Sequence, residues 1–248
     1  MNTPANDKKV ILITGASRGI GAFTAALLAR QGHQIVINYA RNDLEANQVV
    51  EKITAVGGTA SAFKADISQS YQVEQLFEYV IQSYGRVDVL INNAGIMCFQ
   101  KIEALDDETI EKVLAINLKG SLYSMREAAK RLEQGGKIIN LSSSVIGMKL
   151  EGYGIYTASK AAIEALTAIL AKELRGKNIS VNAIAPGPTA TELFFEGKSE
   201  ALIAQLAKAA PLERLGTVED IAAVLDFAVS DASNWINAQV IRANGGII

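Results

Sequence analysis

Tyr156 and Lys160 are the residues of this chain whose types and spacing most clearly suggest chemistry. They stand four positions apart in the run Tyr156-Thr157-Ala158-Ser159-Lys160. On a helix this spacing places both side chains on one face, so the lysine ammonium is expected near the phenol. A positive charge favours the phenolate and is predicted to lower the tyrosine pKa from its free value of about 10. Tyr156 is therefore a candidate general acid or base.

Such a pair also occurs by chance on many helices, so its meaning depends on a second feature near the N-terminus. An apolar, strand-like run at 10–14 leads directly into Gly15-Ala16-Ser17-Arg18-Gly19-Ile20-Gly21 and then into a segment rich in alanine and leucine. Strand, glycine turn and helix start in this order are typical of a dinucleotide pyrophosphate site, where the helix N-terminus stabilises the negative charge. A nucleotide site and a proton-transfer pair together indicate hydride-transfer chemistry.

Length and composition exclude several classes of protein. The 248 residues, 49% of them hydrophobic, suit one α/β domain spanning 1–248 with a large core. The net charge is −2 and no run of Lys or Arg exceeds two residues, so we expect no nucleic-acid or anionic-membrane partner. Residues 1–7 are polar and no apolar stretch is long enough to span a membrane, so neither a signal peptide nor a membrane span is predicted.

The few cysteine and histidine residues add to these exclusions. Cys98 is the single cysteine, which rules out an internal disulfide and suits a reducing, cytoplasmic location. We interpret it as a packing residue. His33 lies away from every motif and is assigned a surface or packing role. The chain has no Cys/His cluster, so no metal site is predicted.

Seven short, β-branched runs alternate with longer amphipathic segments. The predicted strands are 10–14, 35–38, 60–63, 87–91, 137–141, 179–183 and 239–242. This alternation predicts a doubly wound parallel sheet with helices on both faces and a ligand crevice at the carboxyl ends of the strands. The least regular stretch, 186–211, is the candidate for a mobile substrate lid.

The motifs, taken in order, resemble those of the short-chain dehydrogenase/reductase family in its compact form. They are Thr-Gly-Ala-Ser-Arg-Gly-Ile-Gly at 14–21, Asp66, Asn-Asn-Ala-Gly at 92–95, Asn117, the serines at 142–144, Tyr156 with Lys160, Pro186-Gly187 and Gly245-Gly246. The resemblance covers nearly the whole chain and implies a Rossmann-type oxidoreductase. Where the family often ends in Asp-Gly-Gly, this chain has Asn244-Gly245-Gly246.

The resemblance also implies residue roles. The catalytic set would be Asn117, Ser143, Tyr156 and Lys160: the serine polarises the substrate oxygen, the lysine also positions the ribose, and the asparagine sustains a proton relay. The implied cofactor-binding residues, several of them glycines, are Gly15, Ser17, Arg18, Gly19, Ile20, Gly21, Asn38, Tyr39, Arg41, Asp66, Ile67, Asn93, Ala94, Gly95, Tyr156, Lys160, Pro186, Gly187, Thr189 and Thr191.

The choice of serine stays open between two neighbours. Counting along the strand from its start and counting back from Tyr156 both favour Ser143. The family's Ser-x-x-Gly pattern fits Ser144 with Gly147 instead. We predict Ser143 because two of the three counts agree.

The end of the second strand bears on cofactor choice. NAD-binding relatives place an acidic residue there, whereas this chain has Asn38-Tyr39-Ala40-Arg41 and no carboxylate before Asp43. Arg18 and Arg41 could both reach a 2′-phosphate, each through charge-assisted hydrogen bonds worth about 1.5–3 kcal/mol. NADP(H) is therefore predicted over NAD(H); the alternative is that both arginines are solvated surface residues.

The predicted function is NADP(H)-dependent hydride transfer to or from a ketone, aldehyde or secondary alcohol. A 3-oxoacyl-carrier-protein reductase is an alternative, disfavoured by Glu133-Gln134 where such relatives carry basic residues, while Lys177 keeps one basic position open. A non-catalytic, cofactor-sensing protein is a second alternative. Met97, Leu150, Tyr153, Phe194 and Phe195 suggest an apolar substrate pocket, or equally the packed underside of a lid. By analogy with the family, a homotetramer or homodimer is expected.

Overall fold

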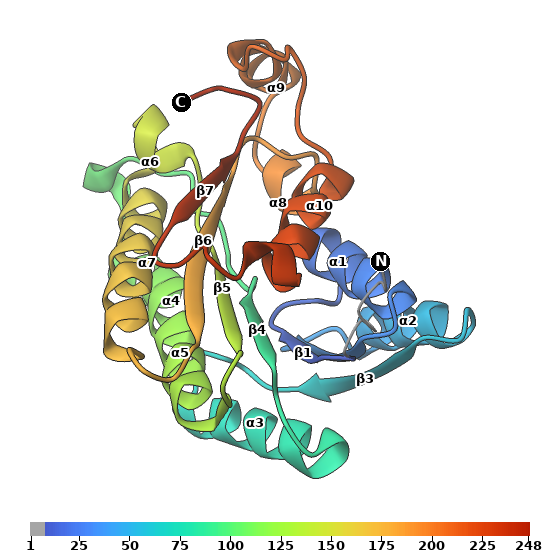
Figure 1. Ribbon diagram of the computed structural model, residues 1–248. Helices are drawn as coiled ribbons and strands as arrows, with labels where there is room; N and C mark the ends of the chain where they lie inside the picture. The colour runs from blue at the N-terminus through green and yellow to red at the C-terminus, as the bar shows by residue number, and fades with distance from the viewer. Residues whose placement is uncertain (1–7) are drawn as a thin grey trace.

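The computed structural model describes residues 8–248, so the N-terminal stretch 1–7 and the signal-peptide prediction made for it lie outside the described residues. Seven strands form one sheet in the order β3-β2-β1-β4-β5-β6-β7, and each neighbouring pair is parallel (Figure 1). The strands are β1 (Val10–Ile13), β2 (Gln34–Tyr39), β3 (Thr59–Lys64), β4 (Val89–Asn92), β5 (Lys137–Leu141), β6 (Ser180–Pro186) and β7 (Val240–Ala243). The predicted doubly wound parallel sheet is confirmed.

Helices cover the two faces of this sheet. The α-helices of the described residues are α1 (Gly19–Arg30), α2 (Asp43–Thr54), α3 (Ser70–Tyr84), α4 (Asp107–Val113), α5 (Ser121–Arg131), α6 (Val145–Met148), α7 (Gly154–Glu173), α8 (Glu192–Phe195), α9 (Glu200–Ala209) and α10 (Val218–Val229), and six of them cover the faces. One core layer joins the sheet to α3, α5 and α7, and the other joins it to α1, α2 and α10 (Figure 1).

The first strand shows why the sequence folds into two layers. All four residues of β1 are apolar and buried, and successive side chains point to opposite faces. Val10 and Leu12 enter the core beneath α3, α5 and α7, whereas Ile11 and Ile13 enter the core beneath α1 and α10. An uninterrupted apolar run is therefore required of a strand that is covered on both sides.

Several strands differ from their predicted bounds by one to three residues. β2 and β3 extend into polar residues because backbone pairing continues there, from Gln34 with Thr59 to Tyr39 with Lys64. β6 reaches Pro186, which pairs with Ala243. A hydrophobic pattern marks the buried part of a strand, whereas the ladder itself is a property of the backbone.

The order of the strands positions the site. The chain moves outward from β1 to β2 and β3, then returns to β4 on the other side of β1 and continues to β7. β1 and β4 therefore form the topological switch point, and the crevice outside their carboxyl ends is where such sheets bind ligands. The 186–211 segment, predicted as a lid, contains α8 and α9, and its end packs against the last residues of the chain, where Ala210 and Pro211 contact Gly245 and Gly246 (Figure 1).

Candidate active site

Tyr156 and Lys160 lie on the first turns of α7 and are both buried, with 8% and 5% of their surface exposed. The Lys160 Nζ stands 5.9 Å from the centre of the Tyr156 ring. Its hydrogen bond goes to the main-chain oxygen of Leu141, at 2.7 Å. The helix thus brings the two side chains to one face, as their spacing predicts, and the lysine also ties α7 to the end of β5.

The predicted lowering of the tyrosine pKa is wrong for this structure. Burial raises the pKa of Tyr156 to about 12, more than the hydrogen bond with Ser143 lowers it. Burial also lowers the pKa of Lys160 to about 8. The same desolvation acts on both partners, because each loses water around its charged form. The helical spacing predicts that these groups lie close together, but it does not predict that they are shielded from water.

Asn117 lies directly behind this pair, in a π-helical turn (Leu114–Gly120) between α4 and α5. Its side chain is fully buried and pairs with the main chain of Ile96 twice, accepting from the N–H at 2.8 Å and donating to the carbonyl at 2.9 Å. A Cβ at Gly95 would sit 3.4 Å from Asn117 Oδ1 and 3.6 Å from Lys160 Nζ. Asn117 and Lys160 therefore converge behind Gly95. Single π-turns of this kind are frequent at functional sites.

The structure distinguishes the two candidate serines. Ser143 lines the crevice together with Tyr156, and its side chain is close enough to the phenol to lower the pKa of Tyr156. Ser144 is almost fully buried, donates to the Ala185 carbonyl at 3.1 Å and accepts from Asn244 Nδ2 at 2.9 Å. The hydroxyl beside the tyrosine is therefore that of Ser143, and the Ser144 hydroxyl faces the neighbouring strands.

The glycine loop closes tightly against the turn at 92–95. Gly15 has φ +62°, and a Cβ there would lie 2.7 Å from the Ala94 Cα, so both its conformation and its surroundings require glycine. Asn93 braces the loop by donating to the carbonyls of Thr14 and Gly15, at 2.9 Å each. Gly21 does not line the crevice. It is buried, with Asn93 Nδ2 only 2.6 Å from where its Cβ would be, so it serves the packing of α1.

The start of α1 suits an anionic ligand. Its N-cap residue, Arg18, makes no capping hydrogen bond from its side chain, and the first turn contains no acidic residue. The first amides of the helix are thus left without a side-chain acceptor, next to a glycine turn that lets a ligand approach the backbone. Both features fit the pyrophosphate of a dinucleotide.

A crevice of about 960 Å³ joins the glycine loop to the tyrosine. Every predicted cofactor residue except Gly21 lines it, as do Ser143, Tyr156 and Lys160. Asn117 does not reach it and lies one layer behind. The sequence motifs, which are spread from residue 15 to residue 191, therefore meet in one continuous space.

The end of the crevice next to β2 bears on the predicted arginine contacts. Arg41 lines it and is exposed, whereas Arg18 forms an ion pair at 3.0 Å with Glu192, the first residue of α8. Asp43 is held by Lys64 at 3.1 Å and does not line the crevice. Asn38 is buried and its side chain turns inward to donate to the Ala65 carbonyl at 2.9 Å. Its Oδ1 accepts from the Gly15 N–H at 3.4 Å, so the side chain is engaged within the protein at both ends.

Known proteins resemble the chain over nearly its full length. The family model described as enoyl-(acyl carrier protein) reductase matches residues 15–248. A short-chain type dehydrogenase/reductase of Picea abies is 44% identical over 96% of this chain and 92% of its own length. The chain belongs to the short-chain dehydrogenase/reductase family. The predicted resemblance is thereby confirmed, and the protein is an oxidoreductase.

The names of two further relatives mention a cofactor. The NADPH-dependent aldehyde reductase 2, chloroplastic, of Arabidopsis thaliana is 40% identical to this short-chain dehydrogenase/reductase over 97% of the chain and 94% of its own length. A putative dehydrogenase of Burkholderia cenocepacia with bound NADP superposes with a TM-score of 0.94, at 30% identity, over 100% of this chain and 96% of its own.

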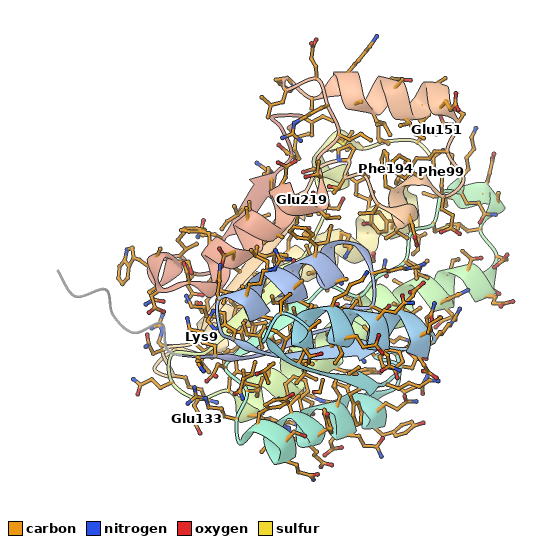
Figure 2. All side chains as sticks on the ribbon, turned by 90° about the vertical axis from the view of Figure 1, so that its right-hand side faces the viewer. Lys9, Phe99, Glu133, Glu151, Phe194 and Glu219 are labelled. Atoms are coloured by element: carbon orange, nitrogen blue, oxygen red, sulfur yellow. The ribbon has the colours of Figure 1, made fainter. Side chains whose placement is uncertain are left out.

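The substrate side of this short-chain dehydrogenase/reductase is apolar. Met97, Leu150, Tyr153 and Phe194 line the crevice, and the first three pack with Tyr156 (Phe194 is labelled in Figure 2). Phe195, predicted with them, does not line the crevice and is 43% exposed. Consecutive residues of the short helix α8 point in different directions, so only one of the two phenylalanines faces inward.

Lys198 is a residue of this region that the sequence reasoning missed. Its Nζ donates to the Phe194 carbonyl at 2.6 Å, lies 3.2 Å from Met97 Sδ, and stands 4.9 Å and 5.9 Å from the ring centres of Phe194 and Tyr153. No motif or spacing signals it, because it joins segments that are 101 residues apart. Lys198 thus connects the 186–211 segment to the wall of the pocket.

The remaining expectations concern residues outside the crevice. His33 is buried and its Nδ1 accepts from the main-chain N–H of Lys9 at 3.2 Å, which is a packing role. Cys98 is half-buried and does not line the crevice. Within residues 8–248, no group of three or more acidic, histidine or cysteine side chains could hold a metal ion, and no helix is long and apolar enough to cross a membrane.

Proposed function

We propose that this enzyme reduces aldehydes or ketones with NADPH, and runs in reverse on the corresponding alcohols. The observation that carries the proposal is the convergence of the Ser143 and Tyr156 hydroxyls at the crevice that starts at the glycine loop. Two hydroxyl groups at one point suit a carbonyl oxygen, which accepts two hydrogen bonds. The bound cofactor would supply the hydride.

The protonation state of the tyrosine suits the proton donor that carbonyl reduction needs. With its pKa raised to about 12, the phenol of Tyr156 is neutral at physiological pH and able to donate a proton to the substrate oxygen. Ser143 would hold that oxygen. Lys160 and Asn117, meeting behind Gly95, would position the ribose and return the proton to the tyrosine. Oxidation of an alcohol would instead require the phenolate, which this burial disfavours.

The preference for NADPH is supported by the end of β2. Arg41 faces the crevice there, whereas the first carboxylate after it, that of Asp43, is occupied by Lys64 outside the crevice. A relative with NADPH in its name and a structural neighbour with bound NADP agree with this choice. The residues that would hold the 2′-phosphate are Arg41 and, once released from Glu192, Arg18.

The apolar wall formed by Met97, Leu150, Tyr153 and Phe194 favours a substrate with an apolar body, in line with the aldehyde reductase relatives. A 3-oxoacyl-carrier-protein reductase is the second candidate, favoured by the acyl-carrier description of the matching family model. Against it, the Lys177 Nζ is engaged by the Ala129 carbonyl at 3.1 Å. A cofactor-sensing role without catalysis is disfavoured because both Tyr156 and Lys160 are in place.

We further propose one catalytic domain over 1–248 that forms a homodimer or homotetramer in the cytoplasm. A groove of about 610 Å³ between α5 and α7 is largely apolar, and Leu122 and Ile169 at its border are 42% and 52% exposed. An exposed apolar groove of this kind is suited to burial against a second copy. The single cysteine, Cys98, agrees with a reducing compartment.

The experiment that tests the proposed function is a matrix of two cofactors and three substrate groups. NADPH or NADH oxidation is followed with aromatic and aliphatic aldehydes, with ketones, and with a 3-oxoacyl thioester, free or loaded on a carrier protein. We expect the highest kcat/KM for an apolar aldehyde or ketone with NADPH. A preference for the carrier-bound thioester would select the second candidate, and cofactor binding without any turnover would overturn catalysis by this site.

A further inference from the structure

Asn244 stands at the position where the sequence departs from the family's Asp-Gly-Gly ending, and its side chain connects the end of the chain to the serine segment. The Nδ2 donates to Ser144 Oγ at 2.9 Å, across 100 residues of sequence. The Oδ1 accepts from the N–H of Gly246, also at 2.9 Å. Because a backbone donor occupies the oxygen, the other side-chain atom must be the amide nitrogen, which fixes the orientation of the amide.

Ser144 is in turn hydrogen-bonded to β6. Its hydroxyl donates to the Ala185 carbonyl at 3.1 Å, and its own N–H donates to the Pro186 carbonyl at 2.8 Å. Ser144 is 1% exposed, so its hydrogen bonds are shielded from water. The residue before it is Ser143, which lines the crevice beside Tyr156. Asn244 is thus hydrogen-bonded to the residue that directly follows Ser143, and that residue is fixed to β6 by its hydroxyl and its main chain.

The packing around Asn244 leaves little freedom. A Cβ at Gly187 would lie 2.8 Å from the Asn244 Cα, and the Gly187 N–H donates to the Ala243 carbonyl at 2.9 Å. At the other side of the serine segment, a Cβ at Gly147 would overlap the side chain of Ile248. Residues 244–248 therefore contact both segments that border the reactive end of the crevice, 143–147 and 186–187.

An aspartate could not make the same set of bonds. A carboxylate only accepts, so it would accept from Ser144 only if the serine turned its single hydroxyl hydrogen away from Ala185. Asparagine donates to the Ser144 oxygen, so the Ser144 hydroxyl hydrogen remains bonded to the Ala185 carbonyl of β6. The amide thus satisfies three groups at once: the Gly246 N–H, the Ser144 oxygen and, through the serine, the Ala185 carbonyl.

We infer that Asn244 is a positioning residue: acting through Ser144, it holds the Ser143 hydroxyl against Tyr156 and fixes the serine segment to the 186–187 turn. The inference rests on the proposed carbonyl reduction for its kinetic effect, but the positions of the two serines can be measured without turnover. Asn244 itself does not line the crevice and has no direct part in the reaction.

The experiment is a double-mutant cycle with Asn244→Ala, Ser144→Ala and the double variant, each with NADPH and the best substrate. We expect either single change to lower kcat by roughly three- to tenfold, the effect of one lost neutral hydrogen bond, with the NADPH Kd changed less than twofold. The double variant should be no worse than the worse single variant, because both changes break the same chain. Asn244→Asp should retain more kcat than Asn244→Ala. Arg242→Ala, an exposed change on β7, is the matched control.

Three results would overturn the inference: multiplying losses in the double variant, an unchanged kcat in both single variants, or a loss fully accounted for by weaker cofactor binding or a lower melting temperature. Crystal structures of the parent and Asn244→Ala supply the readout that needs no activity, because the Ser143 hydroxyl should move away from Tyr156 in the variant. If the parent has no turnover but the serine moves, the proposed function fails and the positioning role stands. If the serine stays in place, the positioning role fails whatever the activity.

Discussion

Replacing Lys160 with methionine should abolish turnover and yet stabilise the fold at neutral pH. The lysine is 5% exposed, and burial lowers its pKa from the ordinary 10.5 to about 8. At about 1.4 kcal/mol per pKa unit, holding a charged lysine in this site costs about 3 kcal/mol. Methionine has a similar length, no charge and an adaptable apolar chain.

Part of this gain in stability is lost because methionine cannot replace the hydrogen bond that Lys160 donates. The Leu141 carbonyl accepts from Lys160 Nζ at 2.7 Å, and losing that bond costs about 1 kcal/mol. The net expectation at pH 7 is therefore an increase of about 2 kcal/mol in the free energy of unfolding of Lys160→Met. A residue that destabilises the fold and is required for activity is typical of an active site.

The lowered pKa of Lys160 also determines how the stability difference between the parent and the variant changes with pH. Between pH 8 and 10.5 the unfolded chain still holds a proton on Lys160 while the folded protein has released it, so the parent becomes more stable as the pH rises. The methionine variant lacks this rise. Its advantage should accordingly be greatest at pH 7 and should vanish by about pH 10, where the desolvation cost that remains in the parent has fallen to about the free energy of the lost hydrogen bond.

The assay is denaturant unfolding at pH 7, 8, 9 and 10, at one protein concentration because an oligomer's stability depends on it. Lys172→Met, an exposed change on the same helix, is the control and should show no comparable trend with pH. A variant less stable than the parent at pH 7, or a difference that does not change with pH, would refute the claim that Lys160 is held in the site at a desolvation cost.

Three further outcomes follow from the geometry of the crevice. Arg41→Ala should weaken NADPH binding by about tenfold with little effect on NADH, and equal losses in a titration of both cofactors would show that it does not contact the 2′-phosphate. Glu192→Gln should tighten NADPH binding by a few-fold at low salt, because it releases Arg18 from its ion pair; an unchanged Kd would mean that Arg18 stays at the surface. Ser143→Ala should lower kcat by about 10²–10³-fold and Ser144→Ala only a few-fold, and the reverse order would assign the substrate oxygen to Ser144.

The sequence was sufficient for the architecture, which follows local rules, and, together with the family resemblance, for most of the residues that line the crevice. The strand, glycine turn and helix start at 10–21 describe a phosphate site on their own, and the spacing of Tyr156 and Lys160 places them together on α7. Alternation of strands and helices then brings the carboxyl ends of the strands to one edge, so motifs that are far apart in sequence line one crevice.

What the sequence could not provide are properties that depend on tertiary contacts. The pairing of Arg18 with Glu192 joins residues 174 positions apart, and that of Asn244 with Ser144 joins residues 100 apart. The pKa of Tyr156 was mispredicted for the same reason: helical spacing gives its distance from a charge, whereas the sign of the shift is decided by burial from every side. The choice between Ser143 and Ser144 likewise needed the partners of both hydroxyls.

The central claim is that Tyr156 donates the proton in carbonyl reduction, and Tyr156→Phe tests it most directly. The change removes one oxygen from a buried ring and leaves the remainder of the crevice in place. With NADPH saturating, single-turnover reduction of the best aldehyde or ketone should slow by about 10²–10⁴-fold or more, while the NADPH Kd stays within about twofold of the parent. A rate within a few-fold of the parent would contradict the assignment of Tyr156 as the acid.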